Sequence, residues 1–292
     1  MLLNPYRFGA SALPLLDTYS GAVAAYSTAR KLKATATNCM RVRRSSDNAQ
    51  TDIGFSGYAL DLSALLTHAG SASEAVVTLY DQVGTANLGN STSGNQPLIV
   101  SSGSLLTVGT EGKACAVLDS TDYLDSSASQ SSFGTAVSLT GNAAWSAFIV
   151  HKKTTNTAGS LFGWGNTGVA LNACGYLDDG SSATVAFAGG NPFVTTVPSN
   201  NTLYLTTIIK AAGAINTSTS VYRNGSSVAS TGHSTGTPNI DGAYPLYLGR
   251  WATNYASNSL QGSVQEFIIF AGDKSADRAA IEADINDCYG IW

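Results

Sequence analysis

Short apolar or alternating runs, separated by Gly, Ser and Asn, recur through the chain from about residue 98 onward. Runs of this length and pattern are typical of strands, and the residues between them favour tight turns. We predict strands at Ala114–Leu118, Ala144–His151, Ser160–Trp164, Ala183–Phe187, Leu203–Lys210, Ser220–Arg223, Ser226–Ser230, Tyr244–Leu248 and Gly262–Phe270. Many short strands of this kind indicate an all-β sandwich or barrel.

The sharpest local signal is the dipeptide Asn224-Gly225. Asn and Gly tolerate the positive φ angles that a type I′ turn requires at both of its central positions. We therefore predict that Val221–Arg223 and Ser226–Val228 pair as a hairpin.

The first third of the chain mixes helical and strand patterns. Met40–Arg44 alternates apolar and basic residues, which predicts a strand with one solvated face, and Ala75–Tyr80 reads as a buried strand. A short helix is expected after Asp17 or Thr18, with Arg30 and Lys31 near its C-terminal end, and a second one near Ser63–His68. The buried strand predicts that residues 17–97 pack onto the main sandwich, residues 98–292, as one domain.

The period changes at the end of the chain. Ile281, Ile285 and Cys288 are spaced as one helical stripe, Ser275 can cap the helix, and Gly290 can end it. We expect this C-terminal helix to pack its apolar stripe onto the sandwich.

Residues 1–16 form a predicted N-terminal arm. They contain Pro5, Gly9 and Pro14, which are incompatible with a regular helix, yet the segment is rich in Leu. An irregular apolar terminus becomes ordered when a partner buries it, so we expect this arm to insert against another protein or a sister subunit.

Composition narrows the class of protein. Charged residues make up 12% of the chain, about half the usual share of roughly 25%. The net charge of −4 provides no basic surface for nucleic acid, and no apolar run is long enough to insert into a membrane. The four cysteines show no CxxC spacing, so we expect buried thiols and neither a metal site nor a cofactor.

Several blocks resemble the laminin-G-like, concanavalin A-like sandwich domains that occur in phage and bacterial surface proteins. The blocks are Ala114–Leu124, Trp145–Val150, Val221–Gly225, Leu246–Gly249 and Leu260–Phe270, and they occur in the family's order. The resemblance covers about residues 110–292. It implies a jelly-roll β-sandwich with a short N-terminal helix and a C-terminal helix.

A second resemblance covers the N-terminal part. Ala24–Arg30, Val42–Ile53 and Leu79–Gly84 resemble the opening of the arabinofuranosidase B catalytic domain, itself a concanavalin A-like sandwich. The same run is also similar to tailed-phage structural and tail proteins, in which the resemblance implies no catalysis. We take the phage version as the closer one.

The carboxylates that the arabinofuranosidase resemblance implies are missing. A glycosidase needs two carboxyl groups across the scissile bond. One is expected in the stretch Leu248–Asn254 and the other on Ala144–Val150, and neither stretch contains Asp or Glu. Substitutes would be Asp119, Asp122 or Glu266, although the two aspartates also suit a turn and Glu266 also suits an outward strand position.

Two further groups of residues could bind a ligand. Trp164, Tyr176, Trp251 and Tyr255 fall at predicted strand ends or loops, where a ring could stack on a sugar; a ring there could equally cover a core edge. Leu177–Gly180 offers carboxylates for Ca²⁺ or forms an ordinary turn.

The resulting hypothesis is a bacteriophage virion structural protein, not an enzyme: a tail fibre, a baseplate appendage or a head decoration. It would be assembled in the host cytoplasm and exposed on the particle. Its partners would be other virion proteins and sister subunits, with a trimer favoured, and a host-surface glycan. The alternative is a glycoside hydrolase of the arabinofuranosidase-like type.

Overall fold

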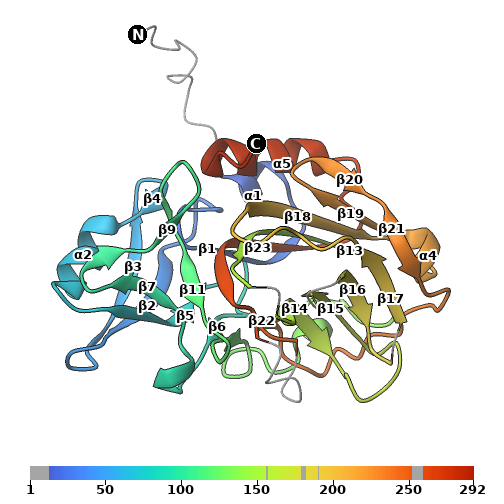
Figure 1. The fold of residues 1–292 in the computed structure, drawn as a ribbon, viewed down its shortest axis with the longest axis horizontal. Coiled ribbons are helices and arrows are strands. Elements are labelled where there is room, and N and C mark those ends of the chain that lie inside the picture. Colours follow the sequence, from blue (N-terminus) through green and yellow to red (C-terminus); the bar gives the residue numbers. More distant parts are fainter. Residues whose placement is uncertain (1–12, 156, 179–181, 190, 252–258) are drawn as a thin grey trace, which may run out of the picture.

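The computed structural model describes residues 13–155, 157–178, 182–189, 191–251 and 259–292. Two antiparallel sheets face each other, and helices cover the outer face of one of them (Figure 1). No helix within the described residues is long and apolar enough to cross a membrane.

The first sheet carries the longest strands. In spatial order it contains β1 (Ala22–Ser27), β23 (Gly262–Ala271), β13 (Trp145–Lys153), β18 (Leu203–Lys210), β19 (Thr219–Arg223) and β20 (Ser226–Val228). Alternate residues of β13 enter two different cores: Trp145, Ala147 and Ile149 face the other sheet, whereas Phe148 and Val150 face the helices. Because both faces are covered, nearly every residue of β13 is buried.

The second sheet closes the sandwich from the other side. It contains β12 (Leu124–Asp125), β22 (Tyr247–Leu248), β14 (Gly159–Gly165), β15 (Ala173–Asp178), β16 (Ala183–Phe187), β17 (Asn191–Thr195) and β21 (Ser230–His233).

The N-terminal third extends these sheets sideways. Its strands are β2 (Asn38–Arg44), β3 (Gln50–Ser56), β4 (Ala59–Leu60), β5 (Glu74–Leu79), β6 (Leu88–Gly89), β7 (Leu98–Ser101), β8 (Ser104–Leu105), β9 (Thr107–Val108), β10 (Lys113–Ala114) and β11 (Ala116–Leu118). β11 pairs with both β7 and β23, and β6 pairs with β12, so hydrogen bonds run continuously from this third into the sandwich.

Short helices occupy the edges and one face. They are α1 (Leu15–Thr18), α2 (Leu62–Ala69), η2 (Ser93–Asn95), α3 (Phe133–Ala136), α4 (Ile215–Ser218) and α5 (Arg278–Tyr289). α5 places Ile281 and Ile285 against the first sheet and ends at Gly290 in the left-handed conformation. The predicted C-terminal helix and its stripe are thereby confirmed, but its N-cap residue is Asp277 and not the predicted Ser275.

Other predictions are also confirmed. The structure contains the Asn224-Gly225 hairpin, with both residues at positive φ, and the strands at Met40–Arg44 and Ala75–Tyr80. Cys39, Cys115 and Cys174 are buried free thiols, while Cys288 is partly buried.

The helix predicted after Asp17 is wrong in extent. α1 ends at Thr18, and Ala22–Ser27 is strand β1, whose side chains alternate between the two cores. Pairing with β23 satisfies its backbone, which outweighs the helix propensity of its alanines. Several other strands, among them β3, β7, β15 and β17, were not predicted at all.

Most of the predicted N-terminal arm, residues 1–12, lies outside the described residues. Within residues 13–16, Leu15 and Leu16 are buried beside α5, and Leu13 is exposed.

Candidate active site

Glu266, one of the candidate carboxylates, is buried and bound by an arginine. Arg30 donates two 2.8 Å hydrogen bonds to the Glu266 carboxylate, from Nε and Nη2, and the Tyr289 hydroxyl donates a third at 3.0 Å. Arg30 also donates to Asp284 on α5 at 2.6 Å. The Glu266 side chain is almost completely buried, so the expectation of an outward strand position is wrong.

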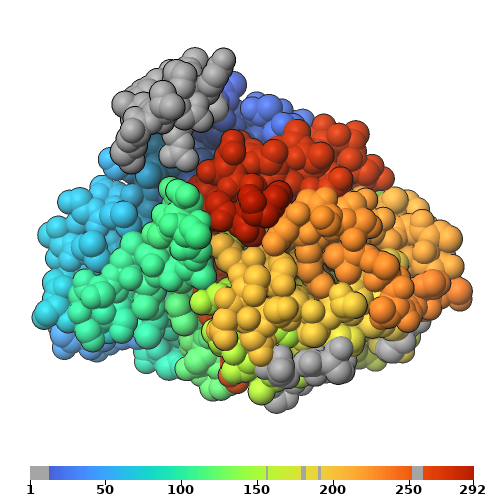
Figure 2. Space-filling view, turned by 45° about the horizontal axis from the view of Figure 1, so that its top comes forward, coloured from blue at the N-terminus to red at the C-terminus, as the bar shows by residue number. Residues whose placement is uncertain are grey.

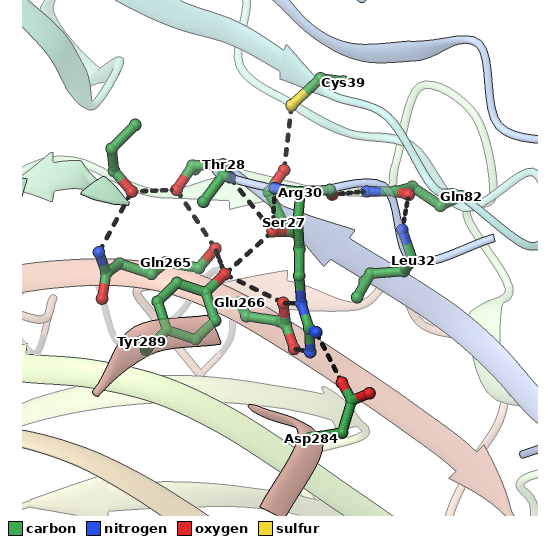
Figure 3. A network of polar contacts seen from close by, with 12 residues as sticks. Ser27, Thr28, Arg30, Leu32, Cys39, Gln82, Gln265, Glu266, Asp284 and Tyr289 are labelled. Atoms are coloured by element: carbon green, nitrogen blue, oxygen red, sulfur yellow. Dashed lines mark hydrogen bonds and ion pairs between the residues drawn. The ribbon is translucent and has the colours of Figure 1, made fainter. Parts of the chain in front are cut away.

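The contacts around Glu266 join three segments that are far apart in sequence. Tyr289 of α5 also contacts Ser27 of β1 at 3.0 Å, and Thr28 donates to the carbonyl of Ala114 at 2.7 Å (Figure 3). A carboxylate held by a guanidinium in this way is a structural anchor.

Asp119 and Asp122 form a turn, as the alternative for them predicted. The Asp119 carboxylate accepts hydrogen bonds from the backbone of Thr121 at 2.7 Å and of Asp122 at 3.2 Å. In return, Asp122 Oδ2 accepts from the backbone N–H of Asp119 at 3.0 Å.

The two aspartates differ in proton affinity. Burial raises the pKa of Asp122 to about 6. The hydrogen bond from the Asp119 backbone acts to lower this pKa, and the negative charge of Asp119 acts to raise it. Burial also acts to raise the pKa of Asp119, but hydrogen bonds from Thr121 and Asp122 outweigh it and leave that pKa below its ordinary value. Such a separation is characteristic of acid–base sites.

Strand pairing brings this turn to the stretch in which the resemblance places a family carboxylate. Leu124 and Asp125 pair with Leu248 and Tyr247. Gly249 turns with a φ of +83°, and a Cβ there would lie 3.3 Å from the carbonyl oxygen of Asp122. Residues 248–251, which include no acidic residue, therefore lie beside a segment that carries two, Asp122 and Asp125.

A surface groove of about 350 Å³ opens at the same place, between β5–β6 and the segment after β12. It combines one aromatic ring, one carboxylate and several neutral hydrogen-bonding groups. Those side chains are Thr78, Asn90, Thr92, Tyr123, Asp125 and Ser127.

The groove is held in shape by its own polar contacts. Asn90 donates to the carbonyl of Tyr123 at 3.0 Å, and Arg250 lies over the Tyr123 ring, 4.0 Å from its centroid. Asp125 Oδ1 accepts from the backbone N–H of Ser127 at 2.8 Å and from the Ser127 hydroxyl. A fixed ring among fixed polar groups is the usual composition of a small-ligand site.

Of the four aromatic residues predicted to stack on sugar, the three that the structure describes do not line this groove. Trp164 is inside the sandwich against Trp145 and Phe133, and Tyr176 is also buried, accepting a 2.9 Å hydrogen bond from Arg223. With both rings enclosed, neither presents a face to a ligand in this structure.

Trp251 is buried as well. A Cβ at Gly163 would lie 2.0 Å from the Trp251 ring and one at Gly175 would lie 2.9 Å from it, so these glycines make the space that the ring fills. Tyr255 lies outside the described residues. The sequence reasoning missed Tyr123, although the block Ala114–Leu124 had already been singled out.

The predicted turn at Leu177–Gly180 begins as a strand. Asp178 is the last residue of β15 and accepts a 2.7 Å hydrogen bond from the buried Lys153 ammonium. Asp179 and Gly180 lie outside the described residues. Among those that are described, no three His, Cys, Asp or Glu side chains lie close enough together to hold a metal ion.

Solved structures provide the decisive comparison. The chain is similar to the crystal structure of an arabinofuranosidase complexed with arabinofuranosyl-α-1,2-xylobiose, with 17% identity, a TM-score of 0.67, and coverage of 94% of this chain and 64% of that one. A glycoside hydrolase family 54 α-L-arabinofuranosidase soaked with a cyclic sulfate inhibitor has the same identity and coverage and a TM-score of 0.69. The fold is therefore a β-sandwich like the one in these two structures.

This likeness confirms the predicted sandwich, and the chain spans less than two thirds of the length of these enzymes. No protein-family model and no curated protein matches the sequence.

The comparison overturns the prediction of a virion structural protein without enzymatic activity. The two solved structures named above, which match 94% of the chain, are arabinofuranosidases, and nothing in the fold or in these comparisons indicates a phage particle. The sequence had suggested both relationships, and the preference for the phage version was wrong.

Proposed function

We propose that this protein is a glycoside hydrolase of the arabinofuranosidase-like type, with its active site in the groove at Tyr123 and Asp125. The observation that carries the proposal is the position of Asp122 and Asp125. They lie on the segment that runs beside residues 248–251, the region in which the resemblance implies a family carboxylate.

The two carboxyl groups suit complementary roles. Asp122, with its pKa raised to about 6, keeps its proton up to about pH 6 and serves as the general acid there. Asp125 lines the groove and serves as the second carboxylate, which faces Asp122 across the scissile glycosidic bond. Tyr123 supplies a flat ring for the apolar face of a sugar.

Hydrolysis of 4-nitrophenyl α-L-arabinofuranoside tests the proposal. Asp125→Asn and Asp122→Asn should each lower kcat/KM by about 100-fold or more, since removing an acid–base group costs 10²–10⁴ in rate. The wild-type rate should fall as pH rises through about 6, because Asp122 then loses its proton.

Asp273→Asn is the matched control. Asp273 accepts a local hydrogen bond from the Ser275 backbone at 2.8 Å and does not line the groove, and Asn preserves that acceptor. Wild-type protein that shows no turnover, or turnover that survives both groove substitutions, would contradict the proposal.

A further inference from the structure

Of the four tryptophans, three are buried and one is not. Trp145, Trp164 and Trp251 are 2%, 0% and 6% exposed, whereas Trp292 is 51% exposed. A large aromatic ring in water loses the free energy of burial that the other three obtain. Its exposure therefore calls for a reason.

Trp292 is held in place by its backbone. The side chain of Asn286 accepts hydrogen bonds from the backbone N–H groups of Ile291 at 2.8 Å and Trp292 at 3.0 Å, and it donates to the Trp292 carbonyl at 2.9 Å. On one side the ring lies against Gly225, where an added Cβ would be 3.5 Å away. The backbone that carries the ring is thus ordered before any ligand arrives, which lowers the entropic cost of binding.

The ring borders a groove of about 260 Å³ between α5 and the β19–β20 hairpin. Figure 2 shows these two elements side by side, α5 in red and the hairpin in orange. Ala279 and Ala283 are exposed along it, and their small side chains leave the helix surface open next to the ring.

Hydrogen-bonding groups border the same groove. Arg278 lies over the Tyr222 ring, 3.9 Å from its centroid, and donates to the buried Glu282, so its guanidinium is oriented. Asp287 is exposed at the rim. A neutral sugar matches this arrangement, because its apolar ring face covers an aromatic ring while its hydroxyls bind planar polar groups.

We infer that the Trp292 groove is a second glycan-binding site, separate from the proposed active site, that takes a sugar unit of a neutral polysaccharide. The two sites lie apart in Figure 1: β6, which borders the proposed active site, is in the lower half of the view, and α5 runs along its upper edge. A single exposed ring is too small for the apolar centre of a stable protein interface, which favours a sugar over a protein partner. The inference rests on the proposed function only for the choice of sugar.

Acrylamide quenching of tryptophan fluorescence tests the site directly, because only Trp292 is accessible. The Asp125→Asn variant serves as the protein, so that the probe is not consumed, and wild type is measured in parallel. Arabinofuranosyl-α-1,2-xylobiose should reduce quenching in a saturable manner. Unchanged quenching up to millimolar sugar would overturn the inference.

Retardation in gels that contain soluble arabinoxylan supplies the second measurement. Trp292→Ala should weaken retention about tenfold or more, the equivalent of one lost aromatic contact. Trp292→Phe should retain part of it, and Asn286→Ala should lower it by releasing the ring. Tyr58→Ala, which removes another exposed aromatic side chain at 48% exposure, should change nothing.

The outcomes separate the two proposals. If sugar protects Trp292 from quenching but the protein shows no turnover, only the proposed hydrolase is refuted. If the protein shows turnover but sugar leaves the quenching of Trp292 unchanged, only the second site is refuted. Protection from quenching that rises with protein concentration in the absence of sugar would assign the groove to a second copy of the chain and overturn the inference.

Discussion

Glu266 and Asp122 are both carboxyl groups that the fold removes almost completely from water, yet they end in opposite situations. Glu266 is enclosed with Arg30, which neutralises its charge through two hydrogen bonds. Asp122 is enclosed beside Asp119, a like charge, and accepts a single hydrogen bond from a backbone N–H.

The difference shows that burial alone does not select a catalytic acid. A buried carboxylate that a guanidinium binds serves a structural role, whereas a buried one without a cation holds its proton more tightly. Both residues were candidate carboxylates by sequence, and only their neighbours distinguish them.

The largest expected effect comes from breaking the Glu266 pair. Arg30→Met should lower the free energy of unfolding by about 3–5 kcal/mol, because it leaves a buried charge without its partner. Equilibrium unfolding in urea at pH 7 measures this. A loss of less than 1 kcal/mol would mean that water reaches Glu266 and that the contrast with Asp122 is false.

An intermediate effect is expected from Asp122→Asn. The pKa of Asp122 is about 6 in the folded protein and about 3.9 in the unfolded chain. Between these values the folded state binds more protons, so the wild type loses stability as pH rises from about 4 to about 6. Asn does not titrate, so the variant should gain roughly 1–2 kcal/mol relative to wild type over that range.

Unfolding measured at pH 4, 5, 6 and 7 would show this, and Asp119→Asn provides the opposite case. The pKa of Asp119 is lowered, so its stabilisation is present above its unfolded pKa and lost as pH falls. That variant should therefore lose stability relative to wild type as pH rises. Parallel curves for the two variants would disprove the assigned difference in proton affinity.

The smallest effect is expected at an exposed pair. Arg41 contacts Asp52 with two 2.8 Å hydrogen bonds, the same geometry as Arg30 with Glu266, but both side chains are more than one third exposed. Arg41→Met should cost no more than about 1 kcal/mol in urea unfolding. A cost equal to that of Arg30→Met would show that geometry, and not burial, sets the strength of these pairs.

Sequence patterns predicted the elements whose signals are local. The Asn224-Gly225 turn and the helical stripe of Ile281 and Ile285 depend on residues a few positions apart, and both are present. β1 and β15 are rich in small residues and carry no strong strand signal. Their pairing with distant strands decides their conformation, and a local pattern does not contain that information.

The same division applies to the site. The sequence by itself determined a sandwich and a short set of candidate carboxylates, because these follow from periodicity and residue type. Only the tertiary structure paired Leu124–Asp125 with Tyr247–Leu248, buried Trp164, and placed Arg30 beside Glu266 and not beside Asp122. Proton affinity and access depend on which groups lie within a few ångströms, and residues hundreds of positions apart in the chain supply those groups.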